Sequence, residues 1–291
     1  MRFAEIGQQL RAYRLESGLR AEEIAARLGV SRAALYRYEK GEVIKLDTVK
    51  RLAELLKVSP LSLLGIGVEY YSRSVGFFER IRQIEESADQ VMQVYGAGIY
   101  LTTSEIFDAT MADGISEAAN LPGIDSAAFR TNAEQVFGIL AARKRVYAQR
   151  RPGIIAILSP SAIQSFLDMG LLGGIKLSDS LRAQCRRVAA SEIQNIATIL
   201  ETEPMGLQFG LMASNEPSGG FSIFRSRDRA MLAANPFRTD SLPSLQTGVA
   251  MITGADEALA AHQRVAEAMW RDAIKGPAAA LRLREMVASH A

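Results

Sequence analysis

The sequence predicts two domains of different class: an N-terminal all-α domain of five short helices, and a C-terminal α/β (α+β) domain with a small sheet and several long helices. A chain of 291 residues is longer than most single domains. The first 65 residues alternate short amphipathic stretches with glycine, and strand-like runs occur only later in the chain. The same 65 residues carry twelve Lys and Arg against eight Asp and Glu, a net charge of +4, whereas the whole chain carries +2.

The amino-acid composition excludes several classes of protein. The chain is 48% hydrophobic and 23% charged, which is typical of a globular protein. Its single cysteine, Cys185, excludes a disulfide framework and a thiolate-rich zinc site, and it fits a reducing cytosol. No apolar run approaches the ~18 residues of a membrane span, and the N-terminus lacks a signal-peptide pattern. We therefore expect a cytoplasmic protein without a membrane segment, a bound metal or a cofactor.

Five helices are predicted for residues 1–65 from apolar spacing and from the residues at their boundaries. The first carries an apolar stripe with the three-to-four spacing of a helix. Ser31 is a good N-cap for the third helix, the fourth starts at Asp47 or Thr48, and Ser59-Pro60 opens the fifth. The first three helices end at Gly18, Gly29 and Gly41.

The second and third of these helices have the pattern of a helix-turn-helix. The joint Gly29-Val30-Ser31 suits a sharp turn that lets the third helix enter the major groove of DNA. On that helix Leu35 and Tyr38 should face the core. An arginine-rich helix start suits both phosphates and guanine edges. The residues left to project outward are Arg32, Ala33, Tyr36 and Arg37.

The stretch LRAEEIAARLGVSRAALYRYEKGE and the following LDTVKRLAELLKVSPLSLL resemble the Cro/phage-repressor-like (XRE) helix-turn-helix family over about residues 5–65. The resemblance implies a lambda-repressor-like fold that binds double-stranded DNA, with an ion pair between Arg14 and Glu39. The family often has glutamine where this chain has Ala21, so Arg20 is the expected substitute. The residues that the resemblance places at DNA are Arg20, Ser31, Arg32, Ala33, Tyr36, Arg37, Lys40 and Lys45.

Residues 66–76 are expected to form a linker, because they mix glycine and serine without a clear period. Residues 77–291 are then the second domain. Its predicted helices span 77–95, 104–111, 127–150, 178–201, 256–274 and 278–289. Its predicted strands span 153–158, 207–213, 221–225, 230–234 and 248–253.

The second domain resembles the effector-like domain that follows the helix-turn-helix in many actinobacterial XRE regulators, on the stretches IRQIEESADQVMQVYGAGIYLTTSEIFDATMA and RKRVYAQRRPGIIAILSPSAI. It departs from that domain at Ser159-Pro160-Ser161, where an acidic residue is usual. A small molecule is expected where strands end against helices, near Ser159, Ser161 and Asn215. The two long helices, 127–150 and 178–201, are the candidates for a subunit interface.

Taken together, these patterns predict a sequence-specific transcription regulator, a repressor that binds a palindromic operator as a homodimer. The second domain is expected to dimerise, to sense a small-molecule effector, or both. Two alternatives stay open: an enzyme with a DNA-targeting head, and an antitoxin-like regulator that binds a partner protein. His262 is the one plausible base for a serine triad, and its helical spacing from Leu259 and Met269 favours an interior or interface histidine. We therefore expect no enzymatic activity.

Overall fold

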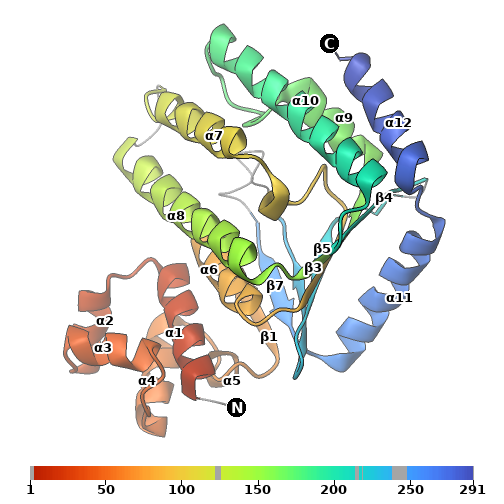
Figure 1. Cartoon of the computed structure of the whole chain (residues 1–291). Coiled ribbons are helices and arrows are strands. Elements are labelled where there is room, and N and C mark those ends of the chain that lie inside the picture. The colour runs from red at the N-terminus through yellow and green to blue at the C-terminus, as the bar shows by residue number, and fades with distance from the viewer. Residues whose placement is uncertain (1–2, 122–125, 214–215, 218, 238–247, 291) are drawn as a thin grey trace.

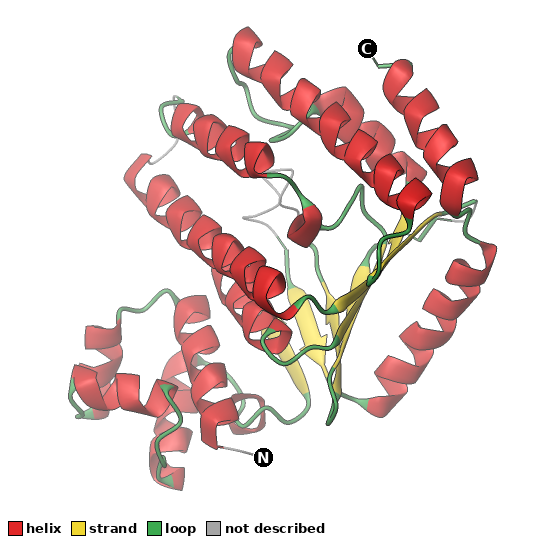
Figure 2. Ribbon diagram, viewed as in Figure 1, coloured by secondary structure: helices red, strands yellow, loops and turns green. Residues whose placement is uncertain are grey.

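The structure, a computed structural model of the 291-residue chain, describes all residues except 1–2, 122–125, 214–215, 218, 238–247 and 291. It consists of a helical head and a larger body in which helices cover a mixed sheet (Figures 1 and 2). A helical N-terminal domain and an α/β C-terminal domain are both confirmed. Within the described residues, no helix is both long and apolar enough to cross a membrane.

The head is built around apolar residues that each helix turns inward. Leu10, Ile24, Leu35 and Leu52 come from four different helices and are completely buried. Serine caps open two of the helices, as the sequence predicts: the Ser59 hydroxyl accepts a hydrogen bond from the backbone N–H of Ser62, and Ser31 does the same at its own helix. The helices of the head are α1 (Phe3–Ser17), α2 (Ala21–Leu28), α3 (Arg32–Glu39), α4 (Leu46–Leu56) and α5 (Pro60–Leu63).

The body contains a seven-stranded sheet, which is larger than the small sheet expected. The strand order is β1-β7-β6-β5-β2-β3-β4, with β2, β3 and β4 parallel and all other neighbours antiparallel. The strands are β1 (Val68–Tyr71), β2 (Gln90–Val94), β3 (Gly153–Leu158), β4 (Leu207–Leu211), β5 (Phe221–Arg225), β6 (Ala230–Ala234) and β7 (Ala250–Thr253).

The two faces of the sheet are covered unequally. Side chains alternate between them, so that along β2 Val91 joins the larger core and Met92 the smaller one. The larger core lies under most of the helices and continues into the head, whereas α11 packs on the smaller core (Figure 1). The body helices are α6 (Ser74–Glu85), α7 (Glu105–Ala118), α8 (Ser126–Arg150), α9 (Pro160–Met169), α10 (Asp179–Thr202), α11 (Asp256–Asp272) and α12 (Gly276–Ala288), with a 3₁₀ turn at Tyr100–Thr102.

Two predicted segments differ from the structure, and one helix of the structure has no counterpart in the prediction. Residues 77–95 do not form one helix, because α6 ends at Glu85 and β2 follows. The sequence QVMQV forms β2 between β3 and β5, where pairing on both sides outweighs its weak helical pattern. The expected linker 66–76 contains β1 and the start of α6. Helix α9, which begins at Pro160, had been missed.

The head is joined to the body through a buried contact between α1 and α6. Tyr13 of α1 stacks on Tyr71 of β1 with ring centroids 5.4 Å apart. Nearby, Glu69 is buried and accepts hydrogen bonds from Gln9 (2.6 Å) and from the Arg80 guanidinium (2.9 and 3.0 Å). These residues come from α1, β1 and α6, so the two parts share one core across the expected hinge.

Candidate nucleic-acid interface

The turn between α2 and α3 is fixed by backbone hydrogen bonds. Gly29 has φ +70°, a left-handed conformation that glycine adopts at low cost. Its N–H donates to Ala26 O (3.2 Å), and the N–H of Val30 donates to Ala25 O (3.0 Å), which is the Schellman pattern of a helix end. The Val30 side chain packs against the core. Ser31 Oγ accepts the Ala34 N–H at 3.1 Å, so α3 begins where the sequence predicts.

Helix α3 has a buried side and an exposed side. Ala34, Leu35 and Glu39 face the core. Arg32, Ala33 and Arg37 are exposed, as is Lys40 just after the helix, whereas Tyr36 is half-buried. The head places α2 and α3 on the side remote from the sheet (Figure 1), so the body does not cover the exposed side. An exposed basic helix on a sharp turn fits the major groove.

Arg32 is held in place by two neighbours. Its NH1 lies 2.7 Å from Glu22 Oε1, and its NH2 donates to the Tyr36 hydroxyl at 3.2 Å. The guanidinium carbon also lies 5.3 Å from the centre of the Tyr36 ring. The hydrogen bond with Tyr36 and the charge of Glu22 raise the pKa of Arg32 above its ordinary value. Arg32 is therefore held in one orientation by Glu22 and Tyr36.

The other predicted contact residues lie around α3 on the same head. Arg37 Nε is 3.1 Å from Glu42 Oε2 in a second exposed ion pair. Arg20 caps α2 through its backbone, because its N–H donates to Glu23 Oε2 (2.8 Å), and the residue is exposed. Lys45 precedes α4 and is also exposed.

Arg14 and Glu39 form a two-pronged ion pair that ties α1 to the end of α3. The distances are 2.5 Å from Nε to Oε1 and 3.1 Å from NH2 to Oε2. Burial lowers the pKa of Arg14, but the hydrogen bond and charge of Glu39 outweigh this and raise it. The same helices approach closely at Gly7, where a Cβ atom would lie 2.5 Å from Tyr38 O. Both contacts fix the angle between α1 and α3.

Sequence reasoning missed four residues beside α3. Glu22 and Glu42 bind the two exposed arginines, and their contacts depend on how α2 and the following loop fold back. Val43 and Leu46 are 70% and 72% exposed in the segment after α3. The sequence could have indicated them, because Val43 lies two residues before Lys45 and Leu46 directly after it, both outside the predicted apolar stripe of the fourth helix.

The predicted effector residues are in a different setting. The Ser159 hydroxyl is buried and caps α9, accepting the Ala162 N–H at 3.0 Å. Both Ser159 and Ser161 donate their hydroxyls to Glu216, and the Ser161 N–H donates to the same carboxylate at 2.9 Å. Burial raises the pKa of Glu216, but these hydrogen bonds outweigh it and lower the pKa. Asn215 lies outside the described residues.

A further candidate of the body, His262, has its contacts within the body. His262 Nδ1 lies 2.8 Å from Ala258 O, and its ring packs edge-on against Phe221. In the described part of the chain, no group of three or more His, Cys, Asp and Glu could hold a metal ion.

Comparison with known families agrees with the geometry of the head. A family described as a helix-turn-helix domain matches residues 5–63. Among curated proteins, no match to the chain was found. The matched segment ends within α5, so it contains both α3 and the turn before it. This segment supports a DNA-binding regulator.

Proposed function

We propose that this protein is a sequence-specific, XRE-type transcription regulator that inserts α3 into the major groove of DNA. The observation that carries the proposal is the exposed side of α3, which offers Arg32, Ala33 and Arg37 on a helix held by a capped turn and by the Arg14–Glu39 pair. A helix held at one fixed angle can present several side chains to base edges at once.

Each contact residue has a distinct proposed role. Arg32 and Arg37 read bases, because a guanidinium can bond to guanine O6 and N7 together. Ala33 and Tyr36 lie along the groove between them. Replacing either arginine by alanine should cost about 1–3 kcal/mol of binding free energy and relax specificity at one position. The residues proposed to contact the backbone are Arg20, Ser31, Lys40 and Lys45.

The body completes the proposed function without an enzymatic step. We propose that it holds two copies of the chain together as a homodimer on a palindromic operator in the cytoplasm, because two heads bind far more tightly than one. The protein would act as a repressor whose affinity for DNA responds to a small molecule bound in the body.

Selection of duplexes from a random library tests this function. The full chain should enrich a palindrome with half-sites about 10 base pairs apart. Light scattering on the enriched duplex should give two chains per duplex. An enriched site without symmetry, occupied by one chain, would contradict the dimer. A library that shows no enrichment over several rounds would contradict sequence-specific binding.

A further inference from the structure

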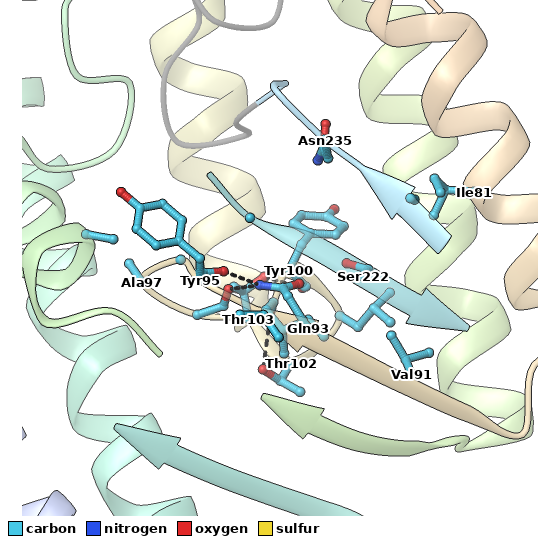
Figure 3. A pocket seen from close by; sticks show the side chains of 18 of the residues that line it. Ile81, Val91, Gln93, Tyr95, Ala97, Tyr100, Thr102, Thr103, Ser222 and Asn235 are labelled. Atoms are coloured by element: carbon cyan, nitrogen blue, oxygen red, sulfur yellow. Dashed lines mark hydrogen bonds between the residues drawn. The ribbon is translucent and has the colours of Figure 1, made fainter. Parts of the chain in front are cut away.

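A cavity of about 430 Å³ lies on the larger-core face of the sheet, at the carboxyl end of β2. It is bounded by α6 on one side and α10 on the other, and the loop after β2 forms part of its wall. In Figure 3, Ile81 and Val91 lie to one side of it and Tyr95 to the other. The volume is within the range of small-molecule sites. The carboxyl end of a parallel strand is also where ligands commonly bind in α/β sheets.

Most of the cavity wall is apolar and aromatic. Phe77 and Phe78 of α6 contact Phe237, with ring centroids 5.8 and 6.5 Å apart. Ile193 and Ile196 of α10 contribute from the opposite side. Binding of an apolar ligand against this wall is favourable, because it removes apolar surface from water.

Three polar side chains lie along one part of this wall, two on neighbouring strands and one just after the next strand (Figure 3). Gln93 of β2 stands directly opposite Ser222 of β5, and Asn235 follows the end of β6, the next strand. The Gln93 amide nitrogen donates to Gly98 O at 2.9 Å, which fixes the orientation of its side chain. Among the described residues, neither Gln93 Oε1 nor the Ser222 hydroxyl has a hydrogen-bond partner. Within the described part of the chain, both atoms are therefore left for a ligand to bond.

The charged side chains among the described residues of the wall already have partners within the protein. Glu85 and Arg143 form a bidentate pair at 2.8 and 2.9 Å. Burial lowers the pKa of Arg143, but the charge and hydrogen bonds of Glu85 raise it, so Arg143 stays charged. Glu192 is buried and accepts hydrogen bonds from the hydroxyl and the backbone N–H of Ser104. An anionic ligand would lose its hydration here and would face Glu192, and the described residues of the wall offer no unpaired cation to compensate.

Helix α6 lies between this cavity and the head. Phe78, Ile81 and Glu85 line the cavity on one of its sides. On another side, Glu79 lies 2.7 Å from Arg11 Nε of α1, and Gln83 Nε2 donates to Gln8 O at 3.1 Å. Gly76 allows α1 to approach so closely that a Cβ atom there would lie 3.0 Å from Glu16 Cα. A displacement of α6 therefore reaches α1 without an intervening loop.

We propose that this cavity is the effector site and that it takes a neutral, largely apolar small molecule with hydrogen-bonding groups at one end. The polar end meets Gln93 and Ser222, and the apolar part lies among the phenylalanines. Occupancy changes the position of α6 and thereby the position of the head on DNA. This last step rests on the proposed function as a DNA-binding regulator, whereas binding in the cavity does not.

Two dyes with the same scaffold test the site on the full chain. N-phenyl-1-naphthylamine is neutral and carries one N–H donor, and 8-anilino-1-naphthalenesulfonate adds a sulfonate to that scaffold. The neutral dye should bind with a stoichiometry of one per chain, and the anionic dye at least tenfold more weakly. Equal affinity for both dyes, or no saturable binding of the neutral dye, would overturn the site.

A filling variant locates the bound dye. Ser222→Phe places a ring in the cavity and should weaken binding of the neutral dye at least tenfold. Ser191→Phe, at an exposed position on α10, is the matched control and should leave the affinity unchanged. Unchanged binding to Ser222→Phe would overturn the location. If circular dichroism shows that Ser222→Phe is unfolded, Ser222→Leu carries the same test with a smaller side chain.

Duplex binding with and without saturating neutral dye tests whether occupancy of the cavity acts on the head through α6, which we call the relay. The dye should change the affinity of the chain for its selected duplex at least threefold, and Arg11→Ala should reduce this change while leaving dye binding intact. An unchanged duplex affinity would overturn the relay through α6. If the proposed function is wrong, the chain should bind no duplex even without dye. Binding of the dye would still be measurable by its fluorescence, because that measurement needs no DNA.

Discussion

Each exposed arginine of α3 already holds a carboxylate in the absence of DNA. Arg32 pairs with Glu22 and Arg37 with Glu42, and more than half of each side chain is exposed. Exposed ion pairs of this kind contribute only about 0–1 kcal/mol. If Arg32 and Arg37 contact DNA as proposed, DNA should displace the two carboxylates at little cost.

Glu22→Gln should strengthen binding to the selected duplex by up to about fivefold, since the competing ion pair is worth at most about 1 kcal/mol. Glu54→Gln is the matched control, because it removes the same charge from an exposed position on α4. Fluorescence anisotropy at one fixed salt concentration compares the two variants. If Glu22→Gln binds more weakly than Glu54→Gln, Glu22 positions Arg32 for DNA rather than competing with it.

At this scale the sequence predicted the outward residues of α3 but not their partners. Helical spacing alone separates Leu35 from Arg32 and Arg37. The contact with Glu22 depends on how α2 folds against α3. The sequence suggests Ser159 as an effector residue because it lies where a strand ends against a helix. A carboxylate 57 residues later accepts its hydroxyl, and no local pattern indicates that contact.

Among the elements of the head, α1 packs closely against the end of α3. Gly7→Ala would place a methyl group 2.5 Å from the Tyr38 carbonyl oxygen, so the helices must separate. We expect a loss of about 1–3 kcal/mol in the free energy of unfolding, measured by urea denaturation. Gly138→Ala on the exposed side of α8 has open space around its new methyl group and should stabilise by roughly 0.5–1 kcal/mol. Equal effects of the two substitutions would contradict this packing.

The contact between α1 and α6 should weaken at acid pH. Burial raises the pKa of Glu79, but hydrogen bonds from Arg82 and the charge of Arg11 outweigh it and lower the pKa. The stabilisation is therefore complete above the ordinary carboxyl pKa of about 4.3 and is lost as the pH falls through the lowered value. Between pH 5 and pH 3, the urea midpoint should fall more in the wild type than in Glu79→Gln. A parallel fall in both proteins would show that Glu79 contributes nothing to it.

Prediction from sequence succeeded for elements with a local signal. Helices α8 and α10 begin and end within one residue of their predicted ranges, because long apolar stripes define them. Strand β2 and the edge strand β1 were not predicted. They have only five and four residues, and their conformation depends on pairing with strands distant in the sequence. The cavity could not be predicted for the same reason, since Gln93 stood in a predicted helix.

For the whole molecule, the buried contact of α1 with α6 and β1 predicts that the head and the body unfold together. The pair of Glu69 with Arg80 is buried, and Gln9 of the head completes it. Removing one partner of a buried ion pair typically costs about 3–5 kcal/mol. The full chain should therefore unfold in a single calorimetric transition, and Glu69→Gln should lower its midpoint. Two transitions, one of which matches an isolated fragment of residues 1–66, would show independent domains.

The central claim is that Arg32 and Arg37 on α3 contact duplex DNA. The most direct measurement is the affinity of the wild type and of the double variant Arg32→Ala/Arg37→Ala for the selected duplex between 50 and 200 mM salt. The wild-type affinity should fall steeply with salt, because bound DNA releases counterions. The double variant should bind much more weakly and should lose the preference for the selected sequence. Equal affinities and equal sequence preferences for the two proteins would contradict the account.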